Sequence, residues 1–238
     1  MNPIIVALDV PAADDAVSLA TRLVPYVGGF KVGLELLMGA GPGVIQRVGA
    51  LGAPVFVDAK LHDIPNTVGG AARQLANAGA RWVTVHGGGG EEMIEAAVSG
   101  LGEGSGGVAG VLVVTVLTSL DEAQLRESGV ERSIPNQVVA VSSLASRAGA
   151  EGVVCSIREA GVVKDVTPAL KVVTPGVRSS DAAPDDQRRT GTLTEALDAG
   201  ADMVVVGRAI TAAPDVVAAA RALAVEAGQA DFSPQRAE

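Results

Sequence analysis

Eight short runs of apolar, mostly β-branched residues recur along the chain, with segments of helical spacing between them. The runs occupy residues 4–10, 30–33, 55–60, 82–87, 110–117, 152–156, 170–176 and 203–208. Their hydrophobicity is continuous rather than alternating, which is typical of parallel strands buried on both faces. The intervening segments include 14–24, 66–79 and 214–228, and glycines that favour helix ends follow several of them, at Gly79, Gly149 and Gly200. Eight strand–helix units predict an α/β fold of the (β/α)8 TIM barrel type.

An open doubly wound sheet is the alternative α/β architecture. The count of eight strands and the absence of a G-x-G-x-x-G motif after the first run argue against it. At 238 residues the chain has the length of one barrel. No linker divides it, so we expect a single barrel domain over residues 1–228 and a flexible C-terminal tail over 229–238. The two longest connections, 118–136 and 177–192, are candidate lids or binding loops.

Composition excludes several classes of protein. Hydrophobic residues make up 48% and charged residues 19%, which excludes disordered and collagen-like chains. The net charge of −9 and the lack of a basic run argue against a nucleic-acid partner. A single cysteine, Cys155, excludes an internal disulfide framework and is expected to be a buried, inert thiol. The N-terminal MNPIIVALDV resembles neither a signal peptide nor a membrane span, so we expect a cytoplasmic protein that does not associate with membranes.

Ionisable residues gather at the ends of the first three predicted strands. They are Asp9, Lys31, Asp58 and Lys60, with Asp63 just beyond. The carboxyl ends of barrel strands meet at one face, where active sites of this fold lie. Because strand side chains alternate with period two, Asp58 and Lys60 are expected on the same side. A structural ion-pair network is the simpler interpretation, but desolvating so many charges is costly, and this favours a functional site.

A lysine held between carboxylates is suited to proton donation. It stays protonated and positioned, so it can deliver a proton to a carbanion that forms nearby. A carboxylate beside an anionic substrate group destabilises that group and favours its loss. The pattern around Lys60 therefore indicates a decarboxylation.

The ends of the last two predicted strands indicate a phosphate site. The seventh ends in TPGVR (174–178) and the eighth in VGRAI (206–210), which leads towards a helix. Barrels of this class commonly bind phosphate between strands 7 and 8 with backbone N–H groups, a helix N-terminus and cationic side chains. Gly207 allows close approach of the backbone, and Arg178 and Arg208 can each bind phosphate oxygens.

The segment DAKLHDIPNT at 58–67 resembles the signature of the orotidine 5′-phosphate decarboxylase family. The resemblance extends over nearly the whole chain, to about residue 226. The supporting segments are LDV at 8–10, FKVG at 30–33, VLTS at 116–119, CS at 155–156, TPGVR at 174–178, DDQRR at 185–189 and VGR at 206–208.

This resemblance implies a role for each charged residue. Lys60 would be the proton donor to pyrimidine C6, and Asp58 would face the departing carboxylate. Asp9 and Lys31 would hold ribose hydroxyls, with Lys31 also part of the charged network. Asp63 would complete that network in the active site of the neighbouring subunit.

The resemblance also implies the remaining substrate contacts. Ile64 and Thr67 would reach the partner's site, where Thr67 contacts the ribose. Thr118 would contact the pyrimidine edge, and Gln187 would bridge the base and the phosphate. The phosphate-side set consists of Pro175, Arg178, Gly207 and Arg208. The family works as a homodimer with shared active sites and uses no cofactor and no metal.

Two departures from the family pattern affect only local loop geometry. Ile157 replaces an expected proline after CS, and HGGGG at 86–90 is unusually rich in glycine. His62 and His86 are candidate acid–base residues, but Lys60 already fills the role of proton donor. We therefore expect His62 to pack or to hydrogen-bond near Lys60.

Two other functions remain open on these residues. Metal-dependent sugar-phosphate decarboxylases and hexulose-phosphate synthases share the D-x-K-x-x-D core, but they hold magnesium partly through an acidic residue at the end of strand 2. Lys31 stands at that place here, and a cation opposes a metal site. A non-catalytic barrel that only binds a phosphorylated ligand would not need Lys60 between carboxylates.

Overall fold

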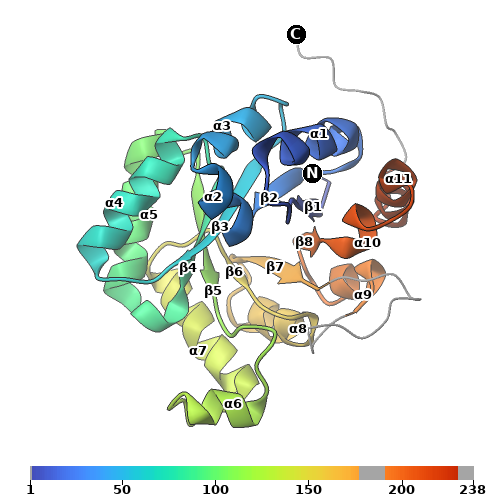
Figure 1. Cartoon of the computed structure of the whole chain (residues 1–238). Coiled ribbons are helices and arrows are strands. Elements are labelled where there is room, and N and C mark those ends of the chain that lie inside the picture. Colours follow the sequence, from blue (N-terminus) through green and yellow to red (C-terminus); the bar gives the residue numbers. More distant parts are fainter. Residues whose placement is uncertain (1, 177–190, 230–238) are drawn as a thin grey trace.

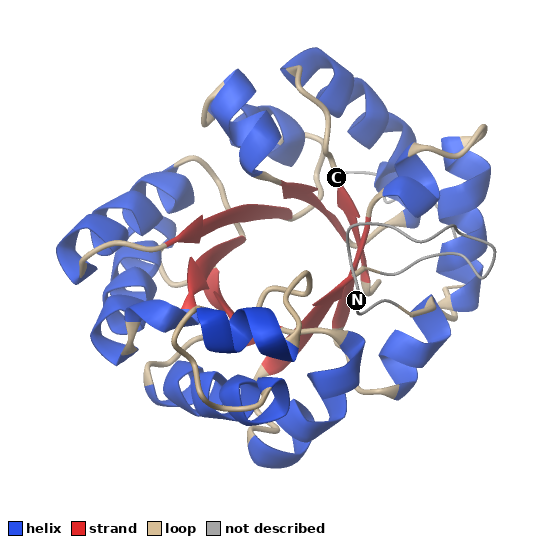
Figure 2. Cartoon of the chain, turned by 60° about the horizontal axis from the view of Figure 1, so that its bottom comes forward, coloured by secondary structure: helices blue, strands red, loops and turns tan. Residues whose placement is uncertain are grey.

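The chain folds into a closed parallel barrel. The computed structural model describes residues 2–176 and 191–229. Within these residues eight strands pair in parallel, each with the next in chain order, and β8 closes the ring by pairing with β1. Figure 1 shows the labelled elements, and Figure 2 shows the strands as an inner ring with the helices around it. The predicted (β/α)8 barrel is confirmed, and the open doubly wound sheet is excluded.

The bounds of the elements follow the predicted alternation of strand and helix. The strands are β1 (Ile4–Ala7), β2 (Gly29–Val32), β3 (Val55–Leu61), β4 (Trp82–His86), β5 (Gly110–Val114), β6 (Gly152–Val154), β7 (Lys171–Pro175) and β8 (Met203–Val206). The helices are α1 (Ala13–Leu23), η1 (Val24–Tyr26), α2 (Leu34–Ala40), α3 (Gly43–Gly49), α4 (Pro65–Asn77), η2 (Gly87–Gly89), α5 (Glu91–Ser105), α6 (Glu122–Glu127), α7 (Ile134–Arg147), α8 (Ile157–Val166), α9 (Leu193–Asp198), α10 (Arg208–Thr211) and α11 (Val216–Glu226).

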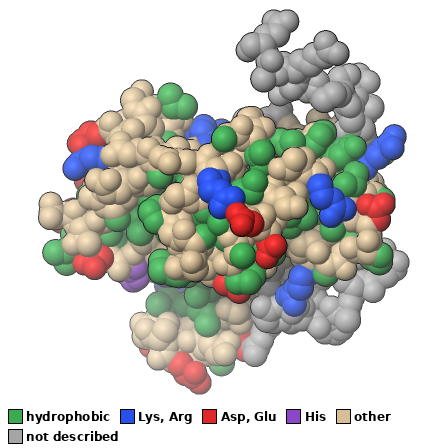
Figure 3. All heavy atoms as spheres, turned by 45° about the horizontal axis from the view of Figure 1, so that its top comes forward, with side chains coloured by type: hydrophobic (Ala, Val, Ile, Leu, Met, Phe, Trp, Pro, Cys, Tyr) green, Lys and Arg blue, Asp and Glu red, His purple; other side chains and the backbone are tan. Residues whose placement is uncertain are grey.

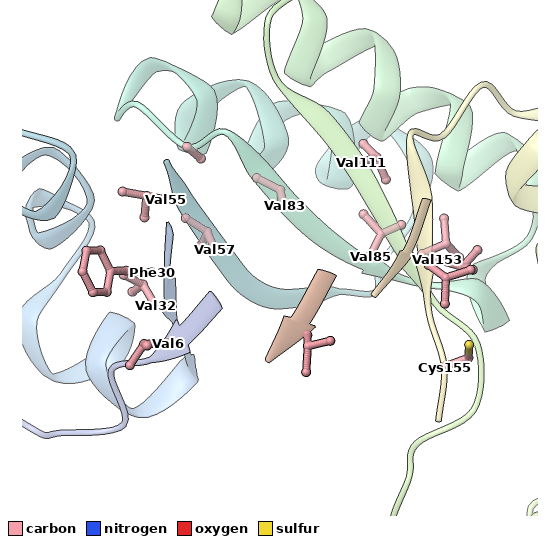
Figure 4. Close-up of a cluster of buried hydrophobic side chains, with 14 of the residues drawn as sticks. Val6, Phe30, Val32, Val55, Val57, Val83, Val85, Val111, Val153 and Cys155 are labelled. Atoms are coloured by element: carbon pink, nitrogen blue, oxygen red, sulfur yellow. The ribbon is translucent and has the colours of Figure 1, made fainter. Parts of the chain in front are cut away.

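Alternate residues of each strand supply two separate cores. In β1, Ile4 and Val6 pack in the layer between the barrel and its helices, whereas Ile5 and Ala7 point into the barrel. Figure 4 shows side chains of the outer layer, such as Val57, on the strands that carry them. The inner cluster consists of Ile5, Ala7, Phe56, Trp82, Leu112, Val173, Met203 and Val205. Burial on both faces is the physical reason for the continuous apolar runs.

A charged cluster lies at the amino-terminal end of the barrel, opposite the carboxyl ends of the strands. Glu151 accepts two hydrogen bonds from the Arg81 guanidinium, at 2.7 and 2.9 Å, and one from Lys171 Nζ at 2.7 Å. Trp82 Nε1 donates a further hydrogen bond to Glu151 at 3.1 Å. A Cβ on Gly110 would collide with the Glu151 carboxylate, so the glycine leaves the space that this carboxylate occupies.

Several predicted boundaries need correction. The first run, 4–10, forms a strand only to Ala7, and the fifth, 110–117, only to Val114. Beyond these strands, Leu8 and Val116 are still buried in the outer core, and the backbone N–H groups of Leu8 and Thr115 still bond to Lys31 and Val154, so each run continues past its strand.

The connections differ from the prediction in one place. Connection 118–136 contains the helix α6, whose capping box joins Asp121 and Gln124. Most of connection 177–192 and all but one residue of the predicted tail lie outside the described residues. The three predicted helix-ending glycines are confirmed, since Gly79, Gly149 and Gly200 all have positive φ.

Candidate active site

Four charged side chains form a continuous chain at the carboxyl end of the barrel. Lys31 Nζ lies 3.1 Å from Asp9 Oδ1 and 3.7 Å from Asp58 Oδ2. Asp58 Oδ1 in turn accepts a hydrogen bond from Lys60 Nζ at 2.8 Å. The order Asp9–Lys31–Asp58–Lys60 alternates in sign and balances two cations against two anions. The prediction that charges from the first three strands meet is confirmed for these four residues.

The two middle members of this chain are more buried than its ends, and Asp9 at the far end is 57% exposed. The side chains of Lys31 and Asp58 are 12% and 15% exposed, whereas that of Lys60 is 35% exposed. The central pair is therefore screened from water, and the Lys60 ammonium is accessible from the barrel mouth. This geometry presents a positioned acid to a ligand while a fixed carboxylate lies beside it.

The backbone of β3 departs from a regular strand where it carries Lys60. Lys60 has a φ of 47°, the only positive value among the described non-glycine residues. β3 takes four residues to pass from Val57 to Leu61, where the paired β4 takes two from Val83 to Val85. This bulge re-aims the end of the strand towards the barrel mouth.

A buried threonine that the sequence analysis did not single out holds this bulge. Thr84 is fully buried in β4 and accepts a hydrogen bond from the Lys60 backbone N–H at 2.9 Å. Its hydroxyl also donates to Asp58 Oδ1 at 3.0 Å. The available signal was one polar residue inside the apolar run WVTVH, because a buried hydroxyl needs a partner.

Gly33 leaves the space in which Lys31 pairs with Asp9. A Cβ on this residue would lie 2.8 Å from Lys31 Nζ and 3.1 Å from Asp9 Oδ1. Those distances are too short for a side chain, so the Lys31–Asp9 ion pair occupies the space that glycine leaves open. The motif FKVG contains this residue, but the sequence pattern alone did not indicate its role.

Three residues of the central motif lie outside the charged chain. Asp63 and Ile64 precede α4, and Thr67 is in its first turn; all three side chains are exposed. The Asp63 carboxylate accepts a hydrogen bond from the backbone N–H of Ile64 at 2.6 Å, and no ion pair among the described residues joins it to Lys60. Within a single chain, Asp63 is therefore not part of the network.

The candidate phosphate side lies at the ends of β7 and β8. Pro175 is the last residue of β7 and pairs with Val205 of β8. A Cβ on Gly207 would meet only the Ala7 side chain, at 3.9 Å, among the described atoms, so the space beside this backbone is open. Exposed Arg208 begins the short helix α10. Since β8 pairs with β1, this side adjoins the end of the barrel that carries Asp9.

Among the other predicted contacts, Thr118 is half-buried in the turn that follows β5. Arg178 and Gln187 lie outside the described residues. Cys155 is buried, as predicted. Ile157 is the first residue of α8, a helix position at which proline is also common, so this departure from the family pattern fits the fold.

The two histidines lie together beside Lys60. The rings of His62 and His86 stack with their centroids 5.1 Å apart and their planes 10° from parallel, which confirms that His62 packs there. Burial, then the charges of His62 and Lys60, lower the pKa of His86 from its ordinary value. His86 is therefore neutral at neutral pH.

The described residues offer neither a cluster suited to a metal ion nor a membrane-spanning helix. In the described ranges, no group of three or more His, Cys, Asp or Glu side chains is arranged to hold a metal ion. No described helix has the length and apolar character needed to cross a membrane. On the face seen in Figure 3, the described basic side chains are scattered, and several lie beside acidic ones.

Comparison with known proteins agrees with this site. Residues 2–223 match the family described as "Orotidine 5'-phosphate decarboxylase / HUMPS family". The chain is 48% identical over 231 residues to a protein of Moorella thermoacetica named orotidine 5'-phosphate decarboxylase, covering 94% of this chain and 92% of that protein. It is 50% identical over 219 residues to the protein of that name from Anaeromyxobacter sp. (strain K), covering 92% and 95%.

Solved structures give the same result. The crystal structure of orotidine 5'-phosphate decarboxylase from Lactobacillus acidophilus matches with a TM-score of 0.84 and 36% identity, covering 95% of this chain and 99% of that one. The corresponding structure from Pyrococcus horikoshii OT3 matches with a TM-score of 0.76 and 27% identity, covering 94% and 99%. With its barrel, its charged motif and its relatives in agreement, this chain belongs to the orotidine 5'-phosphate decarboxylase / HUMPS family.

Proposed function

We propose that this chain decarboxylates orotidine 5′-phosphate to uridine 5′-phosphate and CO2, in de novo pyrimidine biosynthesis in the cytoplasm. The observation that carries the proposal is the alternating chain of Asp9, Lys31, Asp58 and Lys60, with Lys60 Nζ 2.8 Å from Asp58 Oδ1. The names of the relatives support the choice of substrate.

The reaction needs one bond to break and one proton to arrive. Asp58 faces the substrate carboxylate, and repulsion between the two anions favours loss of that carboxylate as CO2. The electron pair of the broken bond stays on pyrimidine C6. Lys60 then donates a proton from Nζ to C6 and regains one from water. Because Thr84 and Lys31 hold Asp58 in place, little reorganisation is required during the reaction.

The remaining substrate contacts follow the ring of strand ends. Asp9 and Lys31 bind ribose hydroxyls, while Pro175, Arg178, Gly207 and Arg208 form the phosphate side. Thr118 binds the pyrimidine edge, and Gln187 joins base and phosphate. Since phosphate binding is remote from C6, its free energy serves to hold the reacting centre in place.

The proposal includes a homodimer with shared active sites. Exposed Asp63, Ile64 and Thr67 lie together at the start of α4, and Asp63 does not reach Lys60 of its own chain. Each site would therefore combine Lys60 from one subunit with Asp63 from its partner.

One assay tests the proposed function against its nearest alternative. Purified protein is treated with EDTA and mixed with orotidine 5′-phosphate, and the loss of pyrimidine absorbance is followed. We expect full activity without added metal, because Lys31 stands at the end of β2, where a sugar-phosphate enzyme of this family would place an acidic metal ligand. Strict dependence on magnesium, or no reaction, would contradict the proposal.

Two variants separate catalysis from simple ligand binding. Lys60→Ala should remove nearly all turnover through kcat, since a proton donor acts mainly in the transition state. Lys164→Ala is the matched control, because Lys164 pairs with Asp202 away from the barrel mouth. Wild-type turnover in Lys60→Ala would exclude Lys60 as the proton donor.

A mixed dimer tests the shared site. Lys60→Ala and Asp63→Ala dimers each lack a complete site, but a mixed dimer has one site with both residues intact. Random exchange by co-expression or refolding makes half of the dimers mixed, so about a quarter of wild-type activity should return in a two-fold dimer. If verified mixed dimers stay inactive, Asp63 acts within its own chain.

A further inference from the structure

The stacked histidines beside Lys60 have no role in the proposed reaction. His62 directly follows β3, and His86 is the last residue of β4. Their rings lie parallel, with centroids 5.1 Å apart. The pair therefore joins the ends of two neighbouring strands at the barrel mouth, two residues beyond Lys60.

The glycine turn η2 is shaped to hold this pair. The backbone N–H of Gly88 donates a hydrogen bond to His86 Nδ1 at 3.1 Å, so the neutral ring carries its proton on Nε2. A Cβ on Gly88 would lie 3.1 Å from His86 Nδ1 and 3.6 Å from His62 Cε1. A Cβ on Gly89 would lie 3.3 Å from His62 Cδ2 and would collide with Met93. The run of glycines leaves room for two imidazoles against the backbone.

The backbone at Lys60 needs such support. Its φ of 47° is in the left-handed region, which a non-glycine residue adopts only where its surroundings hold it. Thr84 holds the start of the bulge through the Lys60 N–H. His86 is two residues further along β4, so its side chain points to the same face as that of Thr84. Thr84 therefore contacts the chain at Lys60, and His86 contacts it at His62, two residues further on.

We propose that His62 and His86 are positioning residues, whose stacking fixes the left-handed backbone of Lys60 and keeps its ammonium against Asp58. The inference rests on the proposed function for the role of Lys60 as proton donor. A neutral His86, whose pKa is lowered by burial and by the charges of His62 and Lys60, sits beside the Lys60 ammonium without repelling it.

Substitutions of His62 separate stacking from proton transfer. His62→Phe keeps a flat ring on His86 but has no titratable nitrogen, whereas His62→Ala removes the ring. We expect kcat to fall on the order of 10- to 100-fold in His62→Ala, with KM changed little, because misplacement of a reacting group by about 1 Å costs roughly 100-fold. His62→Phe should recover most of the loss. If His62→Phe is as impaired as His62→Ala, or if His62→Ala matches the wild type, the proposal is wrong.

A second readout does not depend on activity. Hydrogen exchange is measured on the peptide that contains the Lys60 amide, which is bonded to Thr84. Exchange should accelerate in His62→Ala and not in His62→Phe, with unchanged exchange in the Glu151 region at the opposite end of the barrel. If the wild type fails to act on orotidine 5′-phosphate but this exchange pattern holds, the proposed function fails, whereas the positioning role of His62 and His86 stands. Equal exchange in all three proteins overturns the positioning role of the two histidines.

Discussion

Replacing Glu151 with glutamine should reveal how strongly its charged cluster with Arg81 and Lys171 stabilises the amino-terminal end of the barrel. Burial by itself raises the pKa of Glu151, but hydrogen bonds from Arg81, Lys171 and Trp82 outweigh it and lower that pKa from 4.5 to about 2. A shift of this size corresponds to about 3 kcal/mol of the free energy of unfolding. Removal of the charge also leaves two cations beside each other, so Glu151→Gln should lose about 3–5 kcal/mol at pH 7.

The pH dependence of this loss gives the sharper test. The pKa of the carboxylate is lower in the folded state, so its contribution is complete above pH 4.5 and is lost as the pH falls towards 2. The difference in unfolding free energy between wild type and variant should therefore be constant from pH 8 to about 5.5. It should shrink by about 1 kcal/mol at pH 4 and about 2 kcal/mol at pH 3.

Urea denaturation of both proteins across this pH range measures the difference. Glu91→Gln is the matched control, because both carboxylate oxygens of Glu91 also accept hydrogen bonds from one arginine, Arg147, but at the surface. Solvent screening should make its effect small. If Glu151→Gln costs no more than Glu91→Gln, or if its cost does not change below pH 4.5, the hydrogen bonds to Glu151 do not stabilise the barrel.

Three further substitutions test other parts of the structure. Arg208→Ala should raise KM and lower kcat/KM for orotidine 5′-phosphate, and an unchanged KM would contradict the phosphate assignment. Gly33→Ala should reduce kcat/KM in the same assay, because its Cβ would lie 2.8 Å from Lys31 Nζ and displace the ammonium; wild-type kinetics would show that Lys31 needs no fixed position. Gly100→Ala should lower the unfolding free energy by about 1–3 kcal/mol, since its Cβ would collide with the backbone of α4. On the same helix, Gly102→Ala meets no atom within 4 Å and should stabilise by about 0.4–1 kcal/mol, and equal effects of the two would refute the close packing of α4 on α5.

The barrel was predictable because burial on both faces determines strand composition directly. Most of the strands offer apolar side chains to both the inner and the outer core, and no other element produces eight such short runs. Strand ends were less predictable, because apolar residues such as Leu8 and Val116 remain buried in the outer core beyond the last strand residue. Composition reports burial, whereas a strand boundary depends on hydrogen bonds to a neighbour that is distant in sequence.

The charged site was predicted on an argument that was only partly right. Asp58 and Lys60 do meet, but regular period-two alternation is not the whole reason, because the bulge and the left-handed Lys60 interrupt it. The motif residues were visible in the sequence, but the bulge was not. A bulge arises when one strand uses more residues than its paired neighbour over the same length, and the sequence of β3 alone does not show this. Thr84 did carry a local signal, a lone hydroxyl inside an apolar strand, but its two partners on β3 depend on the bulge.

The glycines and histidines around the site show which sequence signal would have predicted the packing there. HGGGG was interpreted as a departure in a loop, and His62 as a neighbour of Lys60. In the structure the ends of β3 and β4 are adjacent, and the glycines leave the space in which His62 stacks on His86. A run of glycines removes side chains where two rings must stack against backbone, just as Gly33 removes one where Lys31 must meet Asp9. Glycines directly after a barrel strand are therefore best interpreted together with the bulky or charged side chains at the ends of neighbouring strands, because those side chains fill the space that the glycines leave.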